Sequence, residues 1–233
     1  MLKFSIYRYN SEQPELEPYM QEYQLDRSAI KGNMLLDALT TIQEQIDPSL
    51  SFRKSCREGV CGSDGMNING QNTLACIISI SSFGDQTIVI KPLTGMPVIR
   101  DLIVDMSKFN EQYEKVQPYL QNDQEAPVTE RLQSIEQRAE LDGLYECILC
   151  GCCSSACPIY LKEEEQFAGP ASMLQAARFI LDSRDTKTDE RIAQLDEAHG
   201  LFKCRNILTC VDACPKGLDP NKAINNIRKK IFE

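Results

Sequence analysis

The chain is short of positive charge and has no long apolar run. Its 233 residues include 25 Lys and Arg against 34 Asp and Glu, a net charge of −9, which argues against general nucleic-acid binding because that function needs a basic face. Apolar stretches such as Leu74–Ile80 fall far short of the roughly 18 residues that span a membrane. Met1–Tyr9 alternates apolar and polar residues as a strand does, which is unlike a signal peptide. We therefore expect a soluble intracellular protein that binds no nucleic acid and reaches any membrane through partners.

Patterns typical of bond-making catalysis are absent as well. His199 is the only histidine, and because no Ser-His-Asp set surrounds it we expect a structural or exposed side chain. The sequence contains no glycine-rich phosphate loop and no flavin fingerprint. We therefore expect no catalytic residue in this chain.

Cysteine, in contrast, is abundant. The chain has eleven cysteines, an odd number that, without a signal for secretion, argues against a disulfide scaffold. Structural zinc sites usually show cysteine pairs separated by a spacer. Here two runs, Cys147–Pro158 and Cys204–Pro215, share one frame and both end in Cys-Pro. We therefore favour iron–sulfur clusters over zinc.

The two runs predict two clusters, each of which takes one of its ligands from the other run. The first run has the spacing C-x₂-C-x₂-C-x₃-C-P, which is that of a bacterial-type ferredoxin with two clusters. The second run has the same frame with Ile207 in place of its second cysteine. In such ferredoxins the last cysteine of a run ligates the other cluster, and this rule yields two sets. The [4Fe–4S] set is Cys147, Cys150, Cys153 and Cys214, and the other set is Cys157, Cys204 and Cys210.

The set of three thiolates predicts a [3Fe–4S] cluster. With Ile207 as a buried aliphatic side chain at the fourth corner, no ligand is offered to a fourth iron. A [4Fe–4S] cluster with one open corner is the alternative. Cys152 falls outside the two-residue spacing, and we expect it to be an unligated, buried thiol.

A third cysteine loop lies in the first half of the chain. Plant-type [2Fe–2S] ferredoxins have the pattern C-x₄-C-x₂-C and a distant fourth cysteine. Cys56, Cys61 and Cys76 match this pattern, whereas Asp64 occupies the position of the third cysteine. Iron accepts a carboxylate, although it is a harder ligand than a thiolate, so we predict a [2Fe–2S] cluster held by these four residues. The alternative is that Asp64 is a solvated loop acid.

Hydrophobic periodicity predicts an α+β protein with two domains. Residues 1–100 are expected to form a β-grasp, plant-type ferredoxin domain, and residues 101–233 an all-α, bacterial-type two-cluster ferredoxin domain. The expected strands of the first domain are 3–9, 19–25, 73–80 and 87–92, and its expected helix is 34–46. Helices are expected over 100–120 and 170–183, and the last helix is expected to have Asp219 as its N-cap and Pro220 as its first residue.

In the number and order of its cluster sites the sequence resembles the iron–sulfur subunits of succinate dehydrogenase. The resemblance covers nearly the whole chain. The segments that carry it are Phe4–Asn10, Ser55–Gly65, Pro97–Asp105, Leu141–Pro158, Phe179–Asp185 and Cys214–Asp219. Aspartate at position 64 resembles bacterial succinate dehydrogenases, whereas many fumarate reductases keep a cysteine there. The resemblance thus favours succinate oxidation, with fumarate reductase as the alternative.

The resemblance also implies a route for electrons. In this family a flavoprotein subunit oxidises succinate at its FAD, and electrons pass through [2Fe–2S], [4Fe–4S] and [3Fe–4S] clusters to ubiquinone, which joins the tricarboxylic acid cycle to the respiratory chain. Two hydrophobic subunits anchor the complex, which implies a peripheral position on the cytoplasmic face of the bacterial inner membrane. The chain would then carry electrons, while the chemistry on succinate occurs on a partner subunit.

The residues expected at the quinone differ from the family pattern. In relatives the first Cys-Pro is followed by Ser, an aromatic residue and two tryptophans, whereas Ile159–Lys162 follows here and the chain has no tryptophan. Arg205 stands where relatives often have histidine. The candidate quinone-binding residues are Pro158, Ile159, Lys162, Arg205 and Ile207, with the two cations as donors to a carbonyl. Two alternatives are that Lys162 only reaches into solvent and that the subunit is structural, with a decayed quinone site.

Overall fold

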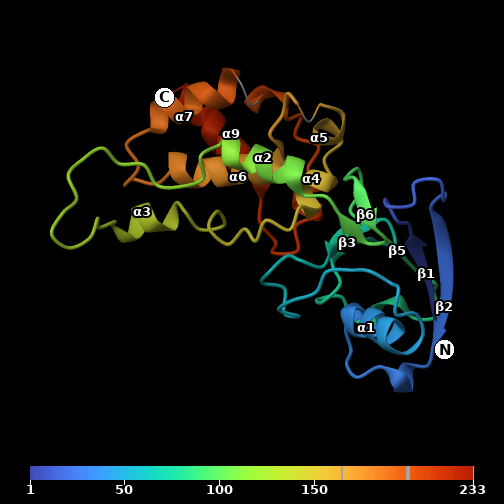
Figure 1. Ribbon diagram of the computed structural model, residues 1–233. Coiled ribbons are helices and arrows are strands. Elements are labelled where there is room, and N and C mark those ends of the chain that lie inside the picture. Colours follow the sequence, from blue (N-terminus) through green and yellow to red (C-terminus); the bar gives the residue numbers. More distant parts are fainter. Residues whose placement is uncertain (164, 198–199, 233) are drawn as a thin grey trace. The chain divides into compact units, whose positions relative to one another are not determined.

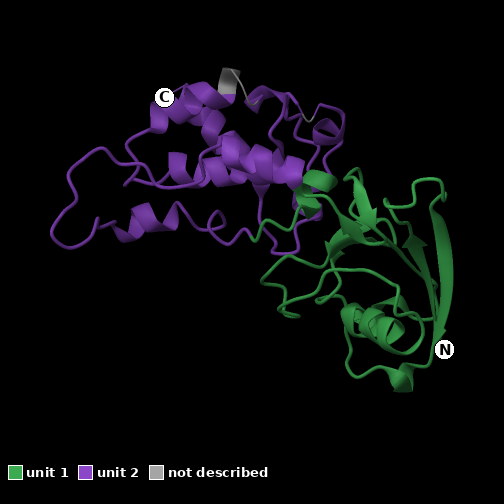
Figure 2. Ribbon diagram, in the orientation of Figure 1, with its two compact units in different colours: residues 1–106, 148–155 green, residues 107–147, 156–233 purple. Residues whose placement is uncertain are grey.

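The computed structural model describes residues 1–163, 165–197 and 200–232 (Figure 1). The chain divides into two compact units (Figure 2): residues 1–106 with 148–155 form unit 1, and residues 107–147 with 156–233 form unit 2. Each unit has a hydrophobic core of its own. The expectation for His199 lies outside the described residues.

Unit 1 is built on a five-stranded mixed sheet in the order β2-β1-β5-β3-β4. The strands are β1 (Leu2–Arg8), β2 (Tyr19–Leu25), β3 (Gly65–Ile68), β4 (Gln71–Leu74) and β5 (Ile88–Lys91). β1 runs antiparallel to β2 and parallel to β5. The helix α1 (Leu35–Gln45) buries its apolar stripe, which includes Leu39 and Ile42, in the same core as the sheet. This combination of sheet and helix is the β-grasp arrangement that the sequence predicts.

Most predicted elements of unit 1 are confirmed, with one exception. The predicted strands 3–9, 19–25 and 87–92 and the helix 34–46 agree with the structure to within one residue at each end. The predicted strand 73–80 is wrong after Leu74, where the chain turns back toward α1. There the N–H group of Leu35, at the start of α1, donates to the carbonyl of Ile78 at 2.9 Å. The apolar residues after Leu74 therefore belong to a loop that satisfies free donors at the helix N-terminus.

A buried arginine, Arg8, ties a late segment of unit 1 to its first strand. Its Nε donates to Oδ1 of Asp101 at 3.0 Å, and its guanidinium also pairs with Asp47. The other oxygen of Asp101 accepts the N–H of Ser51 at 2.8 Å. Arg8 is 8% exposed and Asp101 is 2% exposed. Burial acts to raise the pKa of Asp47, but bonds from Ser49, Tyr23 and Arg8 outweigh it and hold this pKa well below its usual range.

This pairing explains why the predicted helix 100–120 begins late. Asp101 has left-handed backbone, with φ at 48°, and lies between the short strands β6 (Val98–Arg100) and β7 (Ile103–Val104). The helix α2 spans only Ser107–Lys115. The predicted start at Arg100 is therefore wrong, because a long-range ion pair overrides the local periodicity.

Unit 2 is helical, and its core forms where α6 (Gly169–Ile180) packs against α9 (Pro220–Ile231). The N-terminus of α9 is capped as predicted, since the carboxylate of Asp219 accepts the N–H of Lys222 at 2.7 Å and Pro220 is the first helical residue. The remaining helices of unit 2 are α2, α3 (Ile135–Ala139), α5 (Pro158–Lys162), α7 (Thr188–Glu197) and α8 (Thr209–Asp212). The short helix α4 (Cys152–Ser155) belongs to unit 1.

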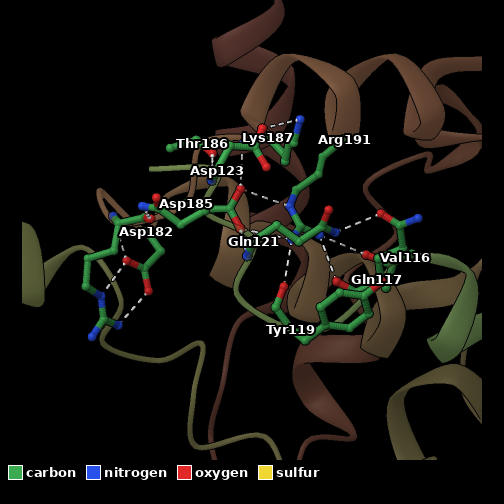
Figure 3. A network of polar contacts seen from close by, with 12 residues as sticks. Val116, Gln117, Tyr119, Gln121, Asp123, Asp182, Asp185, Thr186, Lys187 and Arg191 are labelled. Atoms are coloured by element: carbon green, nitrogen blue, oxygen red, sulfur yellow. Dashed lines mark hydrogen bonds and ion pairs between the residues drawn. The ribbon is translucent and has the colours of Figure 1, made fainter. Parts of the chain in front are cut away.

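Arg191 is the centre of a buried polar network in unit 2 (Figure 3). It pairs with Asp185, Nη2 to Oδ2 at 2.9 Å, and donates to the carbonyls of Gln117 and Tyr119, both at 2.7 Å. The N–H of Gln121 donates to the same carboxylate at 2.9 Å. Because both charged side chains are almost fully buried, the network fixes the segment after α2 to the first turns of α7.

We expect the substitution Asp101→Ala to lower the free energy of unfolding by about 3 kcal/mol, because it leaves the buried Arg8 with fewer partners for its charge. Denaturant unfolding of the chain, followed by circular dichroism, measures this loss. The control is Asp85→Ala, which removes an exposed carboxylate and should change stability by less than about 0.5 kcal/mol. Equal unfolding midpoints for the two variants would contradict the role given to Asp101.

Candidate cluster sites

The first cysteine loop surrounds the thiol of Cys56 with donors. The backbone N–H groups of Glu58, Val60 and Cys61 point at Cys56 Sγ at 3.5, 3.4 and 3.3 Å. The bond from Glu58, followed by those from Cys61 and Val60, lowers the pKa of Cys56 to about 7. The thiolate is the form of cysteine that binds a metal. The loop is therefore arranged for a negatively charged sulfur ligand.

Asp64 and Cys76 lie next to each other in unit 1. The carboxylate of Asp64 accepts the N–H of Cys76 at 2.6 Å. Asp64 is only 2% exposed, so the alternative of a solvated loop acid is wrong. Burial, then the bond to Asp64, raises the pKa of Cys76 to about 12, and the charge of Cys56 adds to this effect. The structure thus brings together the residues of the predicted [2Fe–2S] set, which are Cys56, Cys61, Asp64 and Cys76.

Residues 148–155 pack against the first cysteine loop within unit 1. Gly62 has φ at 70°, and a Cβ atom there would lie 2.9 Å from the carbonyl oxygen of Ile148. Cys152 is fully buried, which confirms the predicted buried thiol. Its carbonyl accepts Nδ2 of Asn72, in β4, at 3.5 Å. The short helix α4 is therefore part of the core of unit 1, held against β4.

Cys157, Cys204 and Cys210 form a second group of thiols, within unit 2. Burial, then the charges of Cys157 and Cys204, raises the pKa of Cys210 to about 12. Burial also raises the pKa of Cys157, and Cys204 contributes to that rise. Such mutual effects require thiols that are close together. The three thiols therefore lie near one another in unit 2, while their role as one ligand set stays a prediction.

The predicted [4Fe–4S] ligands are distributed over the two units. Cys150 and Cys153 belong to unit 1, whereas Cys147 and Cys214 pack against the core of unit 2. The N–H of Leu218 donates to Cys214 Sγ at 3.4 Å. Among the described residues, no three His, Cys, Asp or Glu side chains are grouped tightly enough to hold a single metal ion. The four-thiolate set stays a prediction.

The side chain of Ile207 is exposed, so the expectation that it is buried is wrong. Ile207 is 51% exposed, and its neighbour Leu208 is 48% exposed. Asn206 and Leu208 both have left-handed backbone, with φ at 55° and 71°. This double bend turns the side chains between Cys204 and Cys210 outward. An aliphatic residue thus occupies the surface of unit 2 in the loop that carries two of the three thiols.

The other candidate quinone-binding residues lie on α5 and on the same loop. Pro158 and Ile159 are half-buried, and Lys162 and Arg205 are exposed. An ion pair that no sequence pattern predicted, Lys203 Nζ to Glu163 Oε2 at 2.7 Å, joins the end of α5 to this loop. The two partners are 40 residues apart, beyond the reach of any local signal. The candidate residues are therefore brought to one region of unit 2.

Comparison with known proteins identifies the family. A model for a 2Fe-2S iron-sulfur cluster binding domain matches residues 3–111, and one for a 4Fe-4S dicluster domain matches residues 143–218. The chain is 54% identical over 232 residues to the succinate dehydrogenase iron-sulfur subunit of Coxiella burnetii, covering 100% of this chain and 97% of the relative. The chain belongs to the succinate dehydrogenase iron–sulfur subunit family. The mitochondrial succinate dehydrogenase [ubiquinone] iron-sulfur subunit of Candida glabrata is 47% identical over 229 residues, 98% of this chain and 90% of the relative.

Solved structures agree with this membership. A chain of the Mycobacterium smegmatis Sdh1 complex in the apo form matches with a TM-score of 0.87 and 25% identity, over 99% of this chain and 95% of that one. A hypothetical protein from Helicobacter pylori shares only the fold, with a TM-score of 0.59 and 15% identity over 40% of its length. The predicted fold class, a plant-type ferredoxin domain followed by a helical two-cluster domain, is thereby confirmed. Among the residues of this chain that the structure describes, no helix is long and apolar enough to cross a membrane.

We expect Gly62→Ala to destabilise unit 1 and reduce occupancy of the [2Fe–2S] site, because the new Cβ would lie too close to Ile148. The matched control is Gly70→Ala. Gly70 also has positive φ, at 90°, but a Cβ there would meet nothing within 4 Å. Both variants incur the backbone cost of about 1–2 kcal/mol, so only the clash separates them. Thermal unfolding and the visible absorbance of the cluster measure the difference, and identical behaviour of the two variants would refute the close approach.

Proposed function

We propose that this chain is the electron-transfer subunit of a membrane-associated succinate:quinone oxidoreductase that works in the direction of succinate oxidation. The observation that carries the proposal is the grouping of Cys157, Cys204 and Cys210 in one unit of a succinate dehydrogenase family member. Iron–sulfur clusters, when bound, accept and donate single electrons. The contribution of the chain is to supply the ligands, fix their geometry and set the electrostatic environment.

The proposed ligands are the sets predicted from the sequence. They are Cys56, Cys61, Asp64 and Cys76 for [2Fe–2S], Cys147, Cys150, Cys153 and Cys214 for [4Fe–4S], and Cys157, Cys204 and Cys210 for [3Fe–4S]. The donor chemistry fits, since thiolates are the usual ligands of such clusters. The N–H groups around Cys56 stabilise its negative charge, and Asp64 is the only oxygen donor among the eleven ligands, which are ten cysteines and this carboxylate.

The proposed partners are a flavoprotein subunit that carries FAD and two hydrophobic anchor subunits, on the cytoplasmic face of the bacterial inner membrane. The solved relative is described as part of a complex. Four of the exposed apolar side chains of unit 2 lie on α5 and on residues 202–208. They are Leu161, Phe202, Ile207 and Leu208. Exposed apolar groups of this kind support contact with another subunit or with an apolar quinone.

We propose that the quinone binds at this apolar region of unit 2. Pro158, Ile159 and Ile207 would supply apolar contacts, and Lys162 and Arg205 would donate to a quinone carbonyl in place of the indole and imidazole groups of relatives. Both cations are exposed. The neighbouring carboxylate of Glu163 forms its ion pair with Lys203 and not with Lys162 or Arg205.

Rapid freezing of the purified complex after mixing with succinate, and then with ubiquinone, tests the proposed function. Electron paramagnetic resonance should show cluster reduction by succinate and reoxidation by the quinone. Clusters that succinate cannot reduce would contradict electron transfer by this subunit. Clusters that succinate reduces but no quinone reoxidises would instead support a structural subunit with a decayed quinone site.

We expect Ile207→Cys to convert the three-iron cluster into a four-iron cluster, because it restores a thiolate to the position that the ferredoxin frame assigns to a ligand. The resonance signal of the oxidised three-iron cluster should then disappear. The matched control is Leu208→Cys, which adds a thiol of similar exposure one residue later and should keep that signal. Ile207 is exposed in this structure, so an unchanged three-iron signal in Ile207→Cys would refute the assignment of position 207 to the fourth corner of the cluster.

A further inference from the structure

A row of polar side chains on α9 contacts the loop that carries Cys204. Asn221, Asn225 and Arg228 are spaced by four and three residues, so they share one face of the helix. Arg228 Nη2 donates to the carbonyls of Leu201 and Cys204, each at 2.9 Å. The backbone on both sides of this loop's first thiol is therefore fixed to the helix.

The three side chains are also bonded to one another in series. Arg228 Nη1 donates to Oδ1 of Asn225 at 3.3 Å, and Nδ2 of Asn225 donates to Oδ1 of Asn221 at 3.0 Å. Because the oxygen of Asn221 is held as an acceptor, its amide nitrogen must face the other way, toward the loop. The series thus fixes the orientation of the Asn221 amide.

The amide nitrogen of Asn221 contacts two groups of the loop. It donates to Oδ1 of Asn206 at 2.7 Å and points at Cys204 Sγ at 3.8 Å. An amide nitrogen has two N–H donors, and this arrangement uses both. Asn221 is only 8% exposed, so water competes little for either contact.

We propose that Asn221 is a positioning residue that raises the reduction potential of the cluster held by Cys157, Cys204 and Cys210. This inference rests on the proposed function. A thiolate on iron is an acceptor only, so the contact with Asn221 becomes an N–H bond to negatively charged sulfur. Such a bond stabilises the reduced state, which carries one more negative charge, more than the oxidised state. Hydrogen bonds to the sulfurs are among the features that set cluster potentials.

A redox titration of the purified complex, followed by the resonance signal of the oxidised three-iron cluster, tests this role. Asn221→Leu keeps the approximate size of the side chain and removes both donors, so the midpoint potential should shift downward while the amount of cluster is unchanged. The matched control is Asn226→Leu, on another face of the same helix, which should leave the potential where it is. Asn225→Ala should give a smaller downward shift, because it only frees the Asn221 amide to rotate.

An unshifted potential in Asn221→Leu would overturn the inference. If that variant instead loses the cluster, Asn225→Ala decides, and an unshifted potential there overturns it. An equal downward shift in Asn226→Leu would also overturn it, since the effect would then belong to the helix in general. Absence of the three-iron signal from the unaltered complex is a different result, because it would refute the proposed ligand set itself.

Discussion

The cysteine loops of this chain depend on backbone that bends through the left-handed region. Each of the three loops contains positive φ at a residue other than glycine, namely Arg57, Leu149 and, in the last loop, both Asn206 and Leu208. Each such residue costs about 1–2 kcal/mol, and this conformation persists only where the surroundings hold it. In the loop of Cys56 this bend accompanies a close grouping of donors, since the N–H groups of Glu58, Val60 and Cys61 all point at one sulfur atom. The same type of bend turns Ile207 outward in the second run.

The ion pairs and helix caps away from these loops support the same arrangement. Arg8 and Asp101 hold the end of unit 1 against its first strand, and Arg191 with Asp185 holds the segment after α2 against α7. Both pairs are buried, so either charge alone would be costly. Long-range polar contacts, together with apolar packing, therefore stabilise the two units that carry the cysteine loops.

Sequence patterns predicted the parts of this structure whose causes are local. The strands β1 and β2, the helix α1 and the capped start of α9 each follow from periodicity or from one capping residue. The late start of α2 could not be predicted, because Asp101 is engaged by Arg8, 93 residues away. The exposure of Ile207 depends on the backbone bends of its two neighbours, and the pair Glu163–Lys203 depends on how two loops meet. Among these unpredicted features, only the contact between Asn221 and Asn225 has a local sequence signal, because residues four apart lie on the same face of a helix.

Three departures, two from the ferredoxin patterns and one from the family pattern, characterise the sites of this chain. A buried carboxylate, Asp64, stands where plant-type ferredoxins have a cysteine; Ile207 removes one thiolate and lies on the surface; and cations replace the aromatic residues expected near the quinone. Each change acts on charge, which together with hydrogen bonding governs cluster potential. The proposed contact of Asn221 with Cys204 acts on the same property, the cluster potential, through hydrogen bonding.

The central claim is that one chain holds a two-iron, a four-iron and a three-iron cluster, and the most direct measurement is the iron and acid-labile sulfide content of the purified complex. The account predicts about nine iron atoms and about ten sulfides for each copy of this chain, with no zinc bound to its cysteines. A content near six iron atoms, or zinc in place of iron, would contradict it.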